Sequence, residues 1–218
     1  MPRECHTKSA SNSTLNDTPT AIVVPIRCFS NPLSRLADVL NRSQRVELTR
    51  RMAKRVLAAS SCYPTYIATH DDEVTSWACK IGVPVILVKH PGLSAAAEYS
   101  LRTLAETDIE RVVIVHADLA LAQTLNPAIG PGFVIVPDYN HCGSNVICIP
   151  ADVPFEFSYG KGSFKRHIAE AERLGLPIKV VDDPRLATDI DQSEDLKKLT
   201  VNDLISLGLI GLETELKT

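Results

Sequence analysis

The chain has 218 residues, a formal net charge of −3 at neutral pH, 44% hydrophobic residues and 22% charged residues. This length suits one sizeable domain and is short for two. The small net charge gives no reason to expect nucleic acid or an anionic membrane as a partner, and no apolar run approaches the roughly 20 residues of a membrane helix.

The first 19 residues are polar, rich in Ser, Thr and Asn, and lack the apolar core of a secretory signal. This composition predicts a disordered tail over residues 1–19, ahead of a domain over residues 20–218. The six cysteines form no CxxC pair and no zinc-type spacing. We therefore expect free thiols and a cytoplasmic location.

The first half of the chain alternates apolar strands with amphipathic helices. Strands are predicted over Thr20–Arg27, Thr65–His70, Val83–Val88 and Arg111–Asp118, and helices over Ser43–Ser60, Asp71–Gly82 and Gly92–Glu106. Ser43 is placed to cap the first helix. This alternation is typical of βαβ units in a parallel sheet, and the continuous apolar strands indicate burial on both faces.

The pattern changes after Gly130. Two closely spaced strands, over residues 132–138 and 144–150, have no helix between them, which predicts antiparallel additions to the sheet. A helix over Gly162–Gly175 with Ser163 as its cap, a strand over residues 177–183 and a helix over Ser193–Gly208 follow. The sequence therefore predicts a single-domain, Rossmann-like α/β fold with a mostly parallel sheet.

A carboxylate ends the most apolar predicted strand, which runs through "VVIV" and His116 to Asp118. Ligands of open parallel sheets bind beyond the carboxyl ends of the strands, so Asp118 is a candidate ligand-binding residue. The alternative is that Asp118 caps the following segment. His116 is either a general base or, as its apolar neighbours favour, a packed residue.

A second acidic cluster is "ATDIDQSEDL", in which Asp189 and Asp191 are two residues apart. In an extended chain their side chains point to one side, roughly 6.5–7 Å apart, so both can reach one hydrated Mg²⁺. The alternative is a turn with a helix cap. Because Ser193 and the acids after it already provide a helix start, the two aspartates are free for another role.

Two further stretches carry groups suited to anions. Gly160, Gly162 and Ser163 form a glycine turn at a predicted helix start, and Arg27 and Arg35 follow the first strand. The alternatives are an ordinary loop for the glycines and surface positions for the arginines. Neither stretch is a Walker loop or a GxGxxG motif.

Seven motifs in order carry a family resemblance. They are Pro-Ile-Arg, Ser-Arg-Leu, "HPGLSAAAEYSL", "HADLA", "CGSNVICIP", "GKGSFKRHIAEA" and "DIDQSEDL", between Ala21 and Leu199. This order resembles the 2-phospho-L-lactate guanylyltransferases of deazaflavin coenzyme F-420 biosynthesis, which are molybdopterin-guanylyltransferase-like enzymes. The resemblance implies a nucleotidyltransferase (glycosyltransferase-A-like) fold. It also implies GTP and a small phospho-acid, such as 2-phospholactate, phosphoenolpyruvate or 3-phosphoglycerate, as substrates.

The resemblance also implies roles for single residues. It implies that catalysis rests on Asp118, Arg27 and Arg35, and that Asp118, Asp189 and Asp191 bind Mg²⁺. The nucleotide would be bound by Arg27, Arg35, Gly92 and Ser94. The acceptor would be bound by Ser144, Asn145, Gly160, Gly162 and Ser163.

Four positions depart from the family pattern. Leu33 and Arg27 each replace a lysine, Ser94 replaces an asparagine and Ala120 replaces a proline. The changes around the nucleotide leave open two alternatives: a non-catalytic binding protein, or a nucleotidyltransferase for another phosphorylated acceptor. The sequence also leaves open which phospho-acid is used and whether the protein is a homodimer.

Overall fold

The computed structural model describes residues 18–209. The tail predicted over residues 1–19 therefore lies outside the described residues except at its end. There, the carbonyl of Pro19 accepts hydrogen bonds from the backbone N–H groups of Glu110 (2.9 Å) and Arg111 (3.1 Å). The packed domain thus includes Pro19, one residue ahead of its first strand.

Seven strands form one sheet in the order β3-β2-β1-β4-β6-β5-β7. The strands are β1 (Thr20–Pro25), β2 (Thr65–Thr69), β3 (Val85–Leu87), β4 (Arg111–Val115), β5 (Phe133–Pro137), β6 (Ser144–Pro150) and β7 (Ile178–Val180). Only β6 runs antiparallel to its neighbours β4 and β5. The predicted parallel sheet is confirmed, and its antiparallel part is this single strand.

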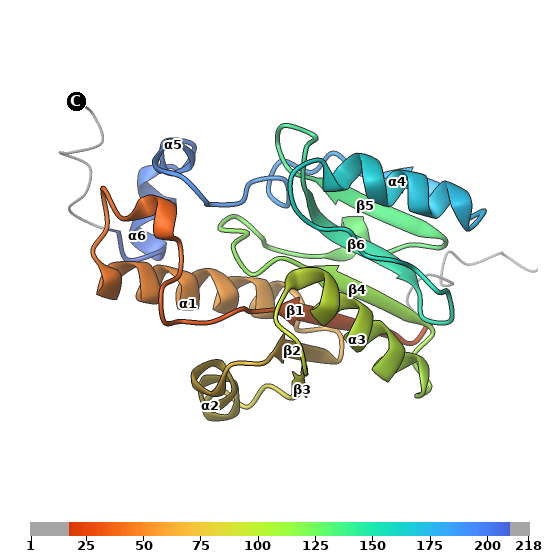
Figure 1. Ribbon diagram of the computed structural model, residues 1–218. Coiled ribbons are helices and arrows are strands. Elements are labelled where there is room, and N and C mark those ends of the chain that lie inside the picture. The colour runs from red at the N-terminus through yellow and green to blue at the C-terminus, as the bar shows by residue number, and fades with distance from the viewer. Residues whose placement is uncertain (1–17, 210–218) are drawn as a thin grey trace, which may run out of the picture.

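Helices cover both faces of the sheet (Figure 1). They are α1 (Arg42–Ala59), α2 (Asp72–Lys80), α3 (Leu93–Ala105), α4 (Ser163–Arg173), α5 (Ser193–Leu196) and α6 (Val201–Ser206), with short 3₁₀ helices η1 (Ser34–Leu36) and η2 (Asn126–Ala128). Within residues 18–209, no helix is both long and apolar enough to cross a membrane.

Alternate residues of β1 pack into two different hydrophobic cores, one on each face of the sheet. Ile22 and Val24 pack with α1, α2 and η2, whereas Ala21 and Val23 pack with α3 and α4. This is why β1 is apolar at every position: successive side chains point to opposite faces, and both faces are covered.

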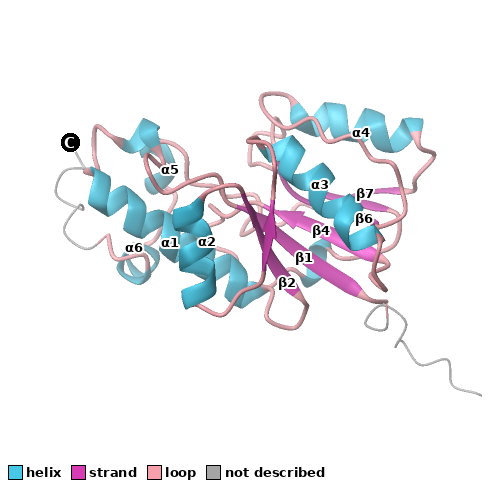
Figure 2. Ribbon diagram, turned by 60° about the horizontal axis from the view of Figure 1, so that its bottom comes forward, coloured by secondary structure: helices cyan, strands magenta, loops and turns pink. Residues whose placement is uncertain are grey.

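A third apolar cluster lies outside the two sheet faces. It joins η1 and α1 to α5 and α6, through residues such as Leu36, Met52, Leu196 and Leu204. Figure 2 shows these helices at one end of the molecule, with α3 and α4 at the other. Both chain ends of the domain therefore contribute to this cluster, beside the edge of the sheet where β1 and β4 end.

Three predicted helix boundaries are wrong. The first helix is capped by Asn41, whose side chain accepts from the backbone N–H of Gln44, so it begins before Ser43. Gly162, not Ser163, is the N-cap of α4. The last predicted helix is two helices, because the Thr200 side chain accepts from the backbone N–H of Asp203 and starts α6 anew.

Candidate functional site

The polar residues predicted for the site converge at one edge of the sheet. Because β6 is antiparallel to β4, its first residues lie beside the last residues of β4. The backbone N–H of His116 donates to the carbonyl of Asn145 (3.0 Å). Asp118, which follows β4, and Ser144 and Asn145, which begin β6, therefore share this edge.

A second strand-like segment brings another carboxylate to Asp118. Leu119 and Asp189 form an isolated antiparallel bridge, and the backbone N–H of Ile190 donates to the carbonyl of Asp118 (3.2 Å). The Asn145 amide donates a long hydrogen bond to Oδ1 of Asp189 (3.4 Å) and so contacts this carboxylate. The structure therefore brings Asp118 and Asp189 together.

The carboxylate of Asp118 is short of partners. About a third of the side chain is exposed (31%), yet its Oδ1 is buried and has no hydrogen-bond partner among residues 18–209. Burial, and after it the nearby carboxylate of Asp189, raise the pKa of Asp118 to about 7. Burial also raises the pKa of Asp189. An unpartnered oxygen beside a second carboxylate fits a divalent cation, which would relieve this repulsion.

Asp118 does not cap a helix. The next regular element is η2, which begins only at Asn126. The alternative considered for Asp118 is therefore excluded by the local structure, and a ligand-binding role is the one that its position supports.

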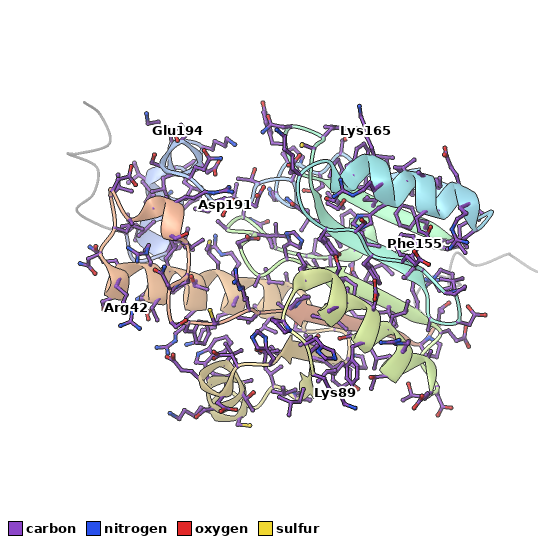
Figure 3. All side chains as sticks on the ribbon, viewed as in Figure 1. Arg42, Lys89, Phe155, Lys165, Asp191 and Glu194 are labelled. Carbon is purple, nitrogen blue, oxygen red and sulfur yellow. The ribbon has the colours of Figure 1, made fainter. Side chains whose placement is uncertain are left out.

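Asp191 forms an ion pair with a basic residue. Its Oδ2 lies 2.6 Å from Nη1 of Arg35, and both side chains are well exposed. Asp191 lies between α5 and the strands of the sheet (Figure 3). Among the described residues, no three His, Cys, Asp or Glu side chains are close enough to hold a metal ion. The pair Asp118 and Asp189 remains sufficient for Mg²⁺, which usually binds one or two carboxylates and keeps several waters.

The other residues assigned to the nucleotide differ in their surroundings. Arg27 is exposed just after β1 and makes no hydrogen bond to any residue within 18–209. Gly92 is the N-cap of α3. Ser94 contacts a different part of the site: its hydroxyl accepts from the backbone N–H of Tyr159 (3.0 Å), in the segment that leads to Gly160.

The two serines assigned to the acceptor face each other beneath the glycine turn. Their hydroxyl oxygens are 3.2 Å apart, and Ser144 and Ser163 are each only 1% exposed. The Ser144 hydroxyl also lies 2.9 Å from Nδ1 of His167. The structure thus brings the predicted serines together but buries them, so an acceptor would meet the backbone of the turn before it meets these hydroxyls.

His167 was missed in the sequence and has a defined tautomer. The backbone N–H of Ser158 donates to its Nε2 (2.9 Å), so the proton of the neutral ring is on Nδ1 and points to Ser144. Burial lowers the pKa of His167 to about 4, which keeps the ring neutral near pH 7. A detectable signal was its spacing, since His167 follows Ser163 by four residues and shares its helix face.

Asp138 was also missed and shapes the turn before β6. Its carboxylate accepts from the backbone N–H groups of Asn140 (3.1 Å), Cys142 (2.7 Å) and Gly143 (2.8 Å). A Cβ at Gly143 would lie 2.8 Å from Oδ2 of Asp138, so any other residue would displace this carboxylate from the turn. The run Asp-x-x-x-Cys-Gly after a strand is a local signal for such a turn.

His116 packs as the apolar strand suggested. Burial lowers its pKa to about 4, and its ring centroid lies 5.3 Å from that of Tyr159. Its Nδ1 is 3.9 Å from Oδ1 of Asp118, which is beyond hydrogen-bonding distance. The structure therefore supports a packed position for His116, with a ring that is neutral near pH 7.

Comparisons with known proteins identify the family. The family described as "Guanylyl transferase CofC like" matches residues 20–203. A phosphoenolpyruvate guanylyltransferase of Rubrobacter xylanophilus is 31% identical over 187 residues, which cover 81% of this chain and 91% of that protein. A 2-phospho-L-lactate guanylyltransferase of Methanocorpusculum labreanum is 26% identical over 189 residues, which cover 79% of each chain.

Solved structures support the fold. A nucleotidyl transferase from Methanothermobacter thermautotroptrophicus superposes with a TM-score of 0.59 at 15% sequence identity, covering 86% of this chain and 98% of that one. The architecture is therefore that of nucleotidyltransferases, as expected from the sequence.

Proposed function

Because the chain belongs to the CofC-like guanylyltransferase family, we propose that it joins GMP from GTP to a small phospho-acid and releases pyrophosphate. One observation carries this proposal. Neighbouring residues at the start of β6 contact the two halves of the site, since Asn145 bonds Asp189 and Ser144 bonds Ser163. The carboxylate pair and the glycine turn are therefore adjacent, as a transfer between two bound phosphates requires.

The reaction needs no general base. A phosphate oxygen of the acceptor, already anionic near neutral pH, attacks the α-phosphorus of GTP. A new P–O bond forms, and the bond from the α-phosphorus to the bridging oxygen breaks, so that pyrophosphate leaves with the electron pair. Positioning and charge neutralisation then account for catalysis.

Asp118 and Asp189 are the residues that would hold Mg²⁺. When bound, the cation neutralises charge on the α-phosphate and on the leaving pyrophosphate. Arg27 is exposed and unpaired within residues 18–209, and Arg35 is bonded only to Asp191, at the surface. Both guanidinium groups are available to the nucleotide phosphates at a small free-energy cost, because an exposed ion pair contributes about 0–1 kcal/mol.

We assign the acceptor to the class of three-carbon phospho-acids, since the relatives are named for phosphoenolpyruvate and 2-phospho-L-lactate. Their shared chemistry is a phosphate and a carboxylate, which suits a turn of backbone N–H groups. We place the reaction in the making of coenzyme F-420, as the family resemblance implies, and in the cytoplasm.

The test is a matrix of acceptors and nucleotides. Phosphoenolpyruvate, 2-phospholactate and 3-phosphoglycerate are each incubated with GTP, ATP, CTP or UTP and Mg²⁺, and pyrophosphate release and product mass are recorded. We expect a GMP adduct of at least one acceptor. Nucleotide binding without pyrophosphate release from any pair would instead favour the non-catalytic binding protein.

A further inference from the structure

We infer that Arg166 is a positioning residue for the acceptor: it holds residues 158–162 so that three consecutive backbone N–H groups face the bound anion. This inference rests on the proposed function for the identity of the acceptor. Arg166 lies in the first turns of α4 and belongs to none of the groups assigned above.

The guanidinium of Arg166 binds four consecutive carbonyl oxygens. Nη1 donates to Lys161 (2.8 Å), and Nε and Nη2 both donate to Ser158 (3.1 and 2.8 Å). Nη2 also lies 3.3 Å from the carbonyl of Tyr159 and 3.4 Å from that of Gly160. One planar side chain therefore gathers every carbonyl from residue 158 to residue 161 on one side of the turn.

The opposite side of the turn must carry the N–H groups. All peptide bonds of the described chain are trans, and in a trans peptide the N–H points away from the preceding carbonyl. The first of these groups, on Tyr159, donates to the hydroxyl of Ser94 on α3. The next three, on Gly160, Lys161 and Gly162, have no acceptor within residues 18–209. Free N–H groups on consecutive residues of a turn are donors that can bind an anion.

The glycines of the turn fit this arrangement. Gly160 and Gly162 have φ angles of +104° and +79°, in the region that favours glycine. A Cβ at Gly162 would also lie 3.3 Å from Nη1 of Arg166, so the side chain can approach this closely because glycine is present. Turn and arginine are therefore matched to each other.

Arg166 acts through the turn and not on the acceptor itself. Its nitrogens are engaged with the carbonyls, and its outer side lines a cavity of about 650 Å³ that also includes Glu98, Glu156 and Glu170. None of the residues assigned to the acceptor or the metal lines this cavity. The cavity gives small solutes access to the guanidinium position.

The experiment compares Arg166→Ala and Arg166→Lys with Arg173→Ala. Arg173 is the matched control, because it lies on the same helix and lines the same cavity but bonds only Glu170. Steady-state rates of pyrophosphate release are measured with phosphoenolpyruvate varied at saturating GTP, and then with GTP varied. Both Arg166 variants should raise the KM for phosphoenolpyruvate about tenfold or more and leave the KM for GTP within about twofold.

Two results would overturn the inference. A normal KM for phosphoenolpyruvate in Arg166→Lys would show that charge alone suffices, and an equal rise in both KM values would show a general loss of structure. Rescue separates these cases further: millimolar guanidinium should lower the raised KM of Arg166→Ala and leave Arg173→Ala unchanged. If Arg166→Ala does not fold, Arg166→Lys decides the question.

A binding measurement keeps the inference separate from the proposed function. Amide NMR signals of Gly160, Lys161 and Gly162 are followed while phosphoenolpyruvate is added to the complete chain. Shifts in the wild type that are lost in Arg166→Lys support the role of Arg166, even if no nucleotide is turned over. Unchanged amide signals in an enzyme that does turn over phosphoenolpyruvate would refute it.

Discussion

At the scale of single residues, burial decides which polar groups are reactive. Burial shifts the pKa of both Asp118 and His167, upward for the carboxylate and downward for the imidazole. Within residues 18–209, Oδ1 of Asp118 has no hydrogen-bond partner and the side chain lies beside Asp189, which is why we propose it as a cation ligand. The imidazole of His167 has both nitrogens bonded and serves to orient Ser144. We propose the first as a binding group, whereas the second orients a neighbouring serine.

Asp118→Asn tests the cation site. The change keeps the shape of the side chain and removes one of two competing charges, so the midpoint of thermal unfolding should stay the same or rise. Turnover at saturating Mg²⁺ should fall about a hundredfold or more, because charge stabilisation of the leaving pyrophosphate is lost. Asp152→Asn, in an exposed turn, is the control. Near-normal turnover in Asp118→Asn would remove Asp118 from the metal site.

His167 predicts a pH dependence of stability. Its pKa is lowered to about 4, by burial first and then by Arg166 and His116, while Glu170 opposes them. Below its ordinary pKa of about 6.5, His167 binds a proton in the unfolded chain but not in the folded chain. The contribution of His167 to the free energy of unfolding is therefore fully present above this pH and is lost as the pH falls toward 4. Between these two pH values the free energy of unfolding falls by about 3 kcal/mol because of His167.

The measurement is urea unfolding of wild type and His167→Gln between pH 7 and pH 4. We expect a shallower fall of the free energy of unfolding in the variant, whatever its stability at pH 7. Parallel curves would show that His167 does not titrate differently in the folded and unfolded chain.

At the scale of elements, helix starts and strand ends build the site. The start of α4 provides the glycine turn, the start of β6 provides Ser144 and Asn145, and the loop after β4 provides Asp118. The last two helices contribute indirectly, because they pack with η1 and α1 and follow the segment that contains Asp189. Their separation at Thr200 is a feature of the apolar cluster beside the site.

Thr200→Ala tests the separate start of α6. The Thr200 side chain accepts from the backbone N–H of Asp203 and donates to its carboxylate (2.6 Å). Its loss should lower the free energy of unfolding by about 1 kcal/mol. Ser193→Ala is the control, because Ser193 is the first residue of α5 and its hydroxyl contacts only the exposed Glu194. Equal effects of the two changes would contradict a cap at Thr200.

At the scale of the whole molecule, three apolar clusters hold one sheet and one group of end helices together. The sheet has a core on each face, and the third cluster joins residues from both ends of the domain. Arg55 reinforces this junction from α1, since it donates to the carbonyl of Ala120 and to the hydroxyl of Ser206. The site lies at the sheet edge where these parts meet.

Two N-terminal deletions test where the domain begins. Removal of residues 1–17 should change neither the unfolding midpoint nor turnover, because this segment is polar and lacks apolar periodicity. Removal of residues 1–19 should destabilise by about 1 kcal/mol or more, since Pro19 accepts from Glu110 and Arg111 beside β1. A clear loss of stability in the shorter deletion would show that the tail contributes to the domain.

The sequence by itself determined the fold class and the edge of the sheet at which the site lies. Apolar strands, helix periodicity and strand-end carboxylates are local patterns, and a parallel sheet places its strand ends at one edge. The order of motifs identified the family in the same way. Asp118, Asp189 and the turn at Gly160 could therefore be predicted before any contact was known.

Only the tertiary structure decided how these residues are engaged. Asp191 pairs with Arg35, and Ser163 is buried against Ser144, because chain segments far apart in sequence come together there. The roles of Arg166 and His167 depend on carbonyls and N–H groups of a turn. Every residue has such backbone groups, so the order of residue types does not predict which of them a side chain will contact. Hydrogen bonds and burial are set by packing between elements. The sequence could therefore indicate which residues lie at the site, but not which of them bond to one another.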